Sequence, residues 1–115
     1  MAFRVEIAPQ AFDDIDGIAA YITEKSSFTV AERWFHGVID DIGSLKDMPA
    51  RYPATPESEE LGLEVRLLLH GRKNRAFRIY YTFDYETPLS GTVRVLHVRH
   101  WARRPLSGDQ FPFLL

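Results

Sequence analysis

The sequence predicts an α+β domain in which a two-helix antiparallel hairpin packs on a four-stranded, mainly antiparallel sheet, in the order β-α-α-β-β-β. Three observations predict this fold class. A short run with period-two alternation comes first, residues 9–47 carry apolar side chains at helical spacing, and residues 63–101 form β-rich runs separated by turn residues. The chain has 115 residues, which suffices for one hydrophobic core and leaves little room for two domains.

The first expected element is a strand over residues 2–7. Apolar and charged side chains alternate along it, which is typical of a strand with one buried face. Pro9 ends this strand, and proline suits the first turn of a helix, expected over 9–24. Acidic side chains in the first turns of that helix complement the positive end of its dipole. Its apolar stripe consists of Phe12, Ile15, Ala19 and Ile22.

A second helix is expected over residues 29–47. Thr29 and Glu32 have the spacing of a capping box, which would satisfy the first free amides of the helix. The connection between the two helices is short, so they are expected to form an antiparallel hairpin. Three prolines between residues 49 and 56 then predict a connecting loop. The apolar positions of the second helix are Ala31, Trp34, Phe35, Val38, Ile42 and Leu45.

Three strands follow, over residues 63–70, 75–85 and 92–101. Residues 75–85 alternate between apolar and polar side chains, and 92–101 are rich in valine. Short turns join these strands, which favours antiparallel pairing. The core is expected to be built from the apolar faces of both helices and the last two strands: Phe12, Ile15, Ile22, Trp34, Phe35, Val38, Ile42, Phe77, Ile79, Tyr81, Val93 and Val95.

Composition restricts the possible chemistry. The chain has no cysteine, which excludes disulfides, cysteine-ligated zinc and a cysteine nucleophile. No pair of histidines or carboxylates has metal-ligand spacing, so neither a metal nor a cofactor is expected. No apolar run approaches the roughly 18 residues of a membrane span, and the N-terminus lacks the apolar stretch of a signal peptide. The expected location is the cytoplasm, without a membrane partner.

Charge is distributed unevenly along the chain. Residues 1–64 hold 5 Lys+Arg and 13 Asp+Glu, a net charge of −8, whereas residues 65–115 hold 9 and 3, a net charge of +6. Such a basic second half suggests a polyanionic or strongly acidic partner. The alternative is that the two halves neutralise each other across the fold. Adjacent acidic residues on the helices, such as Asp13 with Asp14 and Asp40 with Asp41, are interpreted as solvated faces.

The basic side chains gather on and between the last three strands. Guanidinium groups that converge on one sheet face could bind phosphates in bidentate fashion, whereas isolated edge arginines only solvate the sheet. Strict alternation in the last strand would place Arg94, Leu96, Val98 and His100 on one face, and Val93, Val95, His97 and Arg99 on the other. His100 ends that strand, where it could transfer protons, although a lone histidine is more often structural. The set is Arg66, Arg72, Lys73, Arg75, Arg78, Arg94, Arg99, His100, Arg103 and Arg104.

The last five residues, 111–115, read Phe-Pro-Phe-Leu-Leu. A segment this apolar is not expected to remain in water. It should pack on the domain or be buried in a partner.

Residues 64–69, 77–84 and 93–104, together with the order of elements, resemble the RelE/ParE superfamily of bacterial toxins, often called plasmid-stabilisation proteins. The resemblance runs over nearly the whole chain. It implies the toxin of a type II toxin-antitoxin system, held inactive by a cognate antitoxin in a hetero-oligomer. The target that it implies is either DNA gyrase or ribosome-bound mRNA.

The two targets imply different roles for the basic residues. In RelE-like members, which are similar to metal-independent ribonucleases, Arg78, His100 and Arg103 would be catalytic. In ParE-like members, which are similar to protein-binding gyrase inhibitors, only a recognition surface is needed. The second helix lacks the lysine-rich composition of some ribosome-dependent members, which favours the ParE-like interpretation. A third interpretation is a non-toxic binding module for an acidic peptide. The residues expected to bind the target or RNA are Arg66, Arg72, Lys73, Arg75, Arg99 and Arg104.

Overall fold

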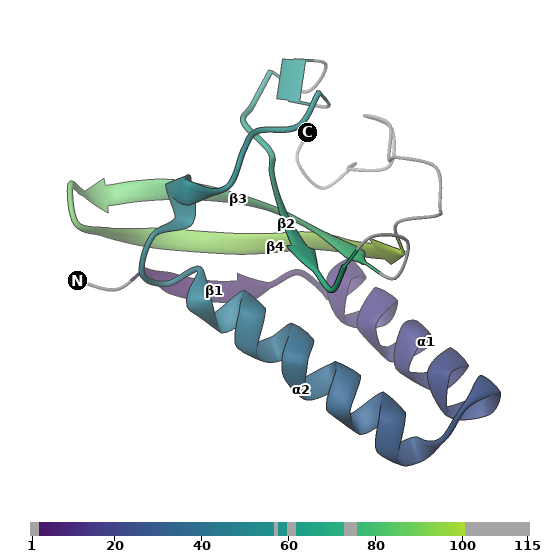
Figure 1. The fold of residues 1–115 in the computed structure, drawn as a ribbon. Coiled ribbons are helices and arrows are strands. Elements are labelled where there is room, and N and C mark those ends of the chain that lie inside the picture. The colour runs from purple at the N-terminus through teal and green to yellow at the C-terminus, as the bar shows by residue number, and fades with distance from the viewer. Residues whose placement is uncertain (1–2, 57, 60–61, 73–75, 101–115) are drawn as a thin grey trace.

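The computed structural model describes residues 3–56, 58–59, 62–72 and 76–100, which form a helical hairpin on one face of a four-stranded sheet (Figure 1). The predicted fold class and order of elements are confirmed, and the bounds differ by a few residues. The elements are β1 (Arg4–Ile7), α1 (Pro9–Lys25), α2 (Phe28–Ser44), a 3-10 helix η1 (Pro49–Arg51), β2 (Arg66–His70), β3 (Phe77–Thr87) and β4 (Ser90–His100).

The sheet has the strand order β1-β4-β3-β2. Neighbours β2 and β3, and β3 and β4, are antiparallel because short turns join them. The pairing of β1 with β4 is parallel, which the long connection through the helical hairpin and two strands allows. The β3–β4 ribbon therefore forms the centre of the sheet. None of the helices described in this structure is long and apolar enough to cross a membrane.

The second helix begins one residue earlier than the capping-box pattern predicts. Ser27 is the N-cap, with an extended backbone, and its Oγ accepts a hydrogen bond from the amide of Val30 at 3.1 Å. The predicted cap, Thr29, is therefore wrong, because it already lies inside the first turn of α2. A serine two residues upstream supplies the same kind of acceptor to the free amides.

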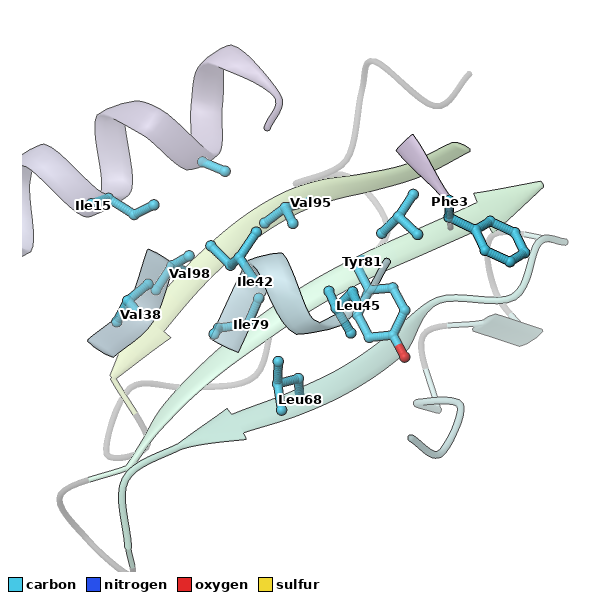
Figure 2. Close-up of a cluster of buried hydrophobic side chains, with 12 residues drawn as sticks. Phe3, Ile15, Val38, Ile42, Leu45, Leu68, Ile79, Tyr81, Val95 and Val98 are labelled. Atoms are coloured by element: carbon cyan, nitrogen blue, oxygen red, sulfur yellow. The ribbon is translucent and has the colours of Figure 1, made fainter. Parts of the chain in front are cut away.

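The hydrophobic core lies between the hairpin and the sheet (Figure 2). Val38 and Ile42 of α2 and Ile15 of α1 are fully buried against β3 and β4, as predicted. Trp34, Phe35 and Phe77 pack against this core but are only partly buried. The prediction for Phe12 is wrong, since it is 49% exposed. The buried face of α1 runs through Ala11, Ile15 and Ile18, and Phe12 lies about 100° around the helix from Ala11.

A β-bulge in β4 changes which side chains share a face. Tyr80 pairs with His97 and Tyr81 with Val95, which leaves Leu96 as the extra residue. Beyond the bulge, Val98 pairs with Ile79, so Val98 lies on the core side and belongs to the core. His100 follows the same parity. The strict alternation assumed for this strand is therefore wrong from residue 97 onwards.

The opposite face of the sheet carries a second, smaller apolar cluster. Val65, Tyr80 and Leu96 are buried there, with Leu63 and Leu67 packed against them. Both helices cover the other face. The central strands are thus buried on both sides, with Val95 and Val98 of β4 in the main core and Leu96 in the second cluster.

Candidate functional site

Three of the predicted basic residues lie at the same end of the sheet. Arg78 in β3 and Arg99 in β4 lie directly opposite each other in the antiparallel register. Arg72 follows shortly after β2, whose last residue, His70, pairs with Phe77. We call Arg72, Arg78 and Arg99 the basic end of the sheet. Lys73, Arg75, Arg103 and Arg104 lie outside the described residues.

The environments of the three arginines differ. Arg72 is exposed, Arg99 is half-buried and Arg78 is only 9% exposed. Arg78 lies on the sheet face away from the helices, because its neighbour Ile79 belongs to the main core. Like charges directly opposite in a sheet repel each other. Arg78 and Arg99 therefore place two positive charges side by side on this face of the sheet.

Arg66 is held away from the basic end by its own hydrogen bonds. Its guanidinium donates to the carbonyl oxygens of Ala50, at 2.9 Å, and Tyr52, forms an ion pair with Glu64 and lies over the ring of Phe83. These contacts tie the η1 segment to β2. Arg66 therefore anchors the η1 segment, a role that the sequence pattern did not indicate.

The η1 segment is anchored a second time by Tyr81. Its hydroxyl donates a hydrogen bond to the carbonyl oxygen of Pro49. Burial raises the pKa of Tyr81 to about 12, so the hydroxyl keeps its proton at all physiological pH values.

Substituting Arg66 with alanine is expected to lower the free energy of unfolding by about 1–3 kcal/mol, because two carbonyl groups lose their donor. Urea denaturation of the purified chain measures this. The matched control is Arg72→Ala, which is exposed and should change the stability by less than about 0.5 kcal/mol. If Arg66→Ala were as stable as Arg72→Ala, the anchoring role of Arg66 would be wrong.

Arg94 lies on β4, outside the basic end, and its charge is compensated there. It donates to Glu6 of β1 at 3.0 Å, and Arg4 lies 3.6 Å from Glu6 and 3.8 Å from Glu86. The acidic and basic parts of the chain thus neutralise each other around β1. This is the alternative considered for the charge asymmetry, and it holds for this region of the sheet.

His97 is bonded to a helix rather than placed for target contact. Its Nδ1 lies 3.2 Å from Oδ2 of Asp14 in α1, and the same oxygen accepts the amide of Val98 at 3.0 Å. Partial burial alone would raise the pKa of Asp14, but the bonds to His97, Val98 and Gln10 outweigh it and lower the pKa. Asp14 therefore occupies the edge of β4 that lies beyond the end of β1.

His70 forms a second pair of the same kind. Its Nδ1 lies 2.6 Å from Oδ2 of Asp41 in α2. The imidazole lies against Gly37, where a Cβ atom would be 2.8 Å from Cε1 of His70. One His–Asp pair thus joins each helix to the sheet.

Sequence reasoning missed both pairs, because Asp14 and Asp41 were interpreted as solvated. The spacing of the two aspartates along their helices could nevertheless have indicated that they are partly buried. Asp14 follows Ala11 by three residues, and Asp41 follows Val38 by three, so each lies on the buried stripe of its helix.

His100 belongs to a row of aromatic rings on the helix side of the sheet. Its ring meets Phe77 edge-on, with centroids 5.0 Å apart, and Phe77 meets Trp34 at 5.1 Å. Arg78 lies on the other face. The bulge at Leu96 therefore separates His100 from Arg78, which strict alternation would have placed on the same side. Among the residues that the structure describes, no group of three or more His, Asp or Glu side chains could hold a metal ion.

The order of the elements and the pairing of the strands define a small α+β protein with a ParE-like fold. A chain of the chromosomal ParDE TA system from P. aeruginosa is structurally similar, with a TM-score of 0.64 and 13% sequence identity. The alignment covers 85% of this chain and 95% of that one. Residues 5–105 match the family of the ParE toxin of type II toxin-antitoxin system, parDE. The protein therefore belongs to the ParE toxin family. No curated protein sequence matches it.

Proposed function

We propose that this protein arrests bacterial growth by binding DNA gyrase, and that a cognate antitoxin of the ParD type neutralises it. Membership of the ParE family supports both parts of this proposal. The observation that carries the choice of target is the placement of His100 and Arg78 on opposite faces of the sheet. A nuclease needs a proton-transfer group and a phosphate-binding cation at one reacting centre.

The contacts that the described histidines make support the same choice of target, DNA gyrase. His70 and His97 pair with helix carboxylates, and His100 packs on Phe77. Each of these contacts stabilises the fold. The exposed Arg72 and the half-buried Arg99 add positive charge to the surface at the basic end, and a surface that binds its target is all that an inhibitor requires.

The antitoxin is expected to cover basic residues with acidic ones. Its C-terminal segment should wrap the toxin, adding a helix to a groove or a strand to an exposed sheet edge. Because opposite charges attract less strongly in salt, the complex should weaken as ionic strength rises. Co-expression with the neighbouring small reading frame, followed by titration calorimetry at two salt concentrations, tests this. A complex indifferent to salt would contradict it.

The substitution that separates the two candidate activities is His100→Ala. For an inhibitor we expect toxicity within about tenfold of the wild type, because one packing contact is lost from many. For a ribonuclease with His100 as the proton donor or acceptor, the loss would be about 10² to 10⁴. Growth after induced expression measures the difference.

Arginine substitutions provide the comparison for His100→Ala. Arg103→Ala combined with Arg104→Ala should lose more toxicity than either alone, and Arg72→Ala and Arg99→Ala should each reduce it in steps. Co-expression with the antitoxin and recovery of soluble complex control for folding. Complete loss of toxicity in a folded His100→Ala protein would favour the ribonuclease.

A further inference from the structure

The helical hairpin carries an apolar groove on its outer side. The sheet covers one side of α1 and α2, and their other side faces away from it (Figure 1). A shallow groove lies between the two helices there. Ala20 and Glu32 are exposed, so this groove opens to solvent and not into the core. We call it the hairpin groove, and the side chains that line it include Ala19, Ala20 and Thr23 of α1 and Phe28, Glu32 and Phe35 of α2.

Two exposed phenylalanines mark the ends of an apolar strip along the hairpin groove. Phe28 lines the groove near the turn between the helices and is 68% exposed. Phe12, which is 49% exposed, precedes Ala19 by seven residues, or about two helical turns, so it lies on the same side of α1. From Phe12 to Thr23, α1 is about 16 Å long. The strip therefore matches about three turns of a partner helix.

Exposed carboxylates lie along both sides of the hairpin groove. On α1, Asp16 precedes Ala20 by four residues and Glu24 follows it by four, so both lie beside Ala20 on one side of the helix. On α2, Glu32 lines the groove, and Asp40 lies about two turns further along the same side. We call Asp16, Glu24, Glu32 and Asp40 the acidic rim.

Basic side chains leave the charge of the acidic rim uncompensated. Among the described residues, none of the ion pairs involves a carboxylate of the rim. The two helices carry two lysine or arginine residues, Lys25 and Arg33. Lys25 lies over the ring of Tyr21, and Arg33 lies about 100° around α2 from Glu32. The rim therefore attracts a positively charged partner.

We propose that the hairpin groove binds a basic amphipathic helix of a partner protein. The apolar side chains of that helix lie between Phe12 and Phe28, and its lysine or arginine side chains pair with the acidic rim. Along the groove, the backbone groups of α1 and α2 bond within each helix, so an extended peptide would find few backbone partners there. A helix bonds its own backbone groups and can bury an apolar face in such a groove.

Charge opposes the other occupants of such a surface. Two copies of this chain joined through the hairpin groove would bring their acidic rims together, and like charges across an interface are unfavourable. An anionic membrane surface would be repelled by the rim. An acidic segment, of the kind expected at the basic end, would be repelled in the same way. The hairpin groove thus selects a partner segment of the opposite charge.

A synthetic peptide tests the proposal on the purified full-length chain. The probe is a fluorescent amphipathic helix of about 18 residues, with leucine at helical spacing and lysine beside it. We expect it to bind with a Kd of about 1–100 μM in a fluorescence anisotropy titration, and the Kd should rise with salt. Two control peptides, one with glutamate in place of lysine and one with the same residues in scrambled order, should bind at least about tenfold more weakly.

Substitutions in the chain locate the bound probe. Phe28→Ala should weaken binding by about tenfold, and Glu24→Gln combined with Glu32→Gln by about threefold or more. The matched control is Glu59→Gln combined with Asp84→Asn, which removes two exposed carboxylates outside the two helices and should change the Kd by less than about twofold. All five side chains are exposed, so each variant should unfold at nearly the temperature of the wild type.

Three results of the titrations would overturn the proposal: no binding of the lysine peptide, equal binding of the glutamate peptide, or an unchanged Kd in Phe28→Ala. Sedimentation of the free chain tests a second copy as the occupant, and a dimer that Phe28→Ala dissociates would also contradict the proposal. Residues 111–115 lie outside the described residues. If the lysine peptide binds only after their removal, the groove is filled from within the chain and the proposal is wrong.

Discussion

Replacing Gly91 with alanine is expected to lower the free energy of unfolding by about 3–5 kcal/mol. Gly91 is buried at the start of β4 and pairs with Tyr85 of β3. A Cβ atom there would lie 1.9 Å from the carbonyl oxygen of Asp84 and 3.0 Å from the ring of Phe3. Because the closest atom belongs to the backbone of the neighbouring strand, the clash can be relieved only by disturbing the β3–β4 pairing.

Two other glycines serve as controls for Gly91. Gly17 in α1 and Gly43 in α2 have nothing within 4 Å of an added Cβ atom. Gly17→Ala is expected to stabilise the protein by about 0.5–1 kcal/mol, because alanine favours the helix. Urea denaturation of the variants measures both effects. A loss below about 1 kcal/mol for Gly91→Ala would contradict the close packing of β3, β4 and Phe3.

Replacing Asp14 with alanine is expected to cost about 2–4 kcal/mol at neutral pH. The substitution removes the acceptor of the Val98 amide and the partner of the buried His97 ring. Without Asp14, the edge of β4 that lies beyond the end of β1 also loses the side chain that covers it. The exposed Asp13, its neighbour in the sequence, provides the matched control, and Asp13→Ala should leave the stability nearly unchanged.

The contribution of Asp14 should also depend on pH. Because the folded state lowers its pKa below the ordinary value of 3.8, the carboxylate stabilises the fold at pH values above 3.8. This stability is lost as the pH falls through the folded-state pKa. The urea midpoints of the wild type and Asp14→Asn should therefore differ by a constant amount near neutrality and converge in acid. A difference that persists unchanged at the lowest pH would contradict the ionised state of Asp14.

The elements of this fold could be predicted because their signals are local. Helical spacing, period-two alternation and the turn residues each lie within a few positions of one another. The bulge at Leu96 could not be predicted, because β4 is apolar on both faces and an extra apolar residue leaves no mark on its pattern. One inserted residue nevertheless changes the face of every side chain after it.

The candidate site depends on that same register. Arg78, Arg99 and Arg72 were all in the predicted basic set, but which of them meet is decided by pairing between strands. Arg66 looked equivalent to them in the sequence and is committed to the η1 segment by two carbonyl groups that are distant in the chain. Charge type is visible in a sequence, whereas the partner of a charge is a tertiary property.

The most direct test of the proposed function is a gyrase supercoiling assay with the purified chain, run beside a ribosome-dependent mRNA cleavage assay on the same preparation. We expect the wild type and His100→Ala to inhibit supercoiling to a similar degree, added antitoxin to restore it, and neither chain to cleave mRNA. Uninhibited gyrase together with mRNA cleavage that disappears in His100→Ala would contradict the proposal and identify a ribonuclease.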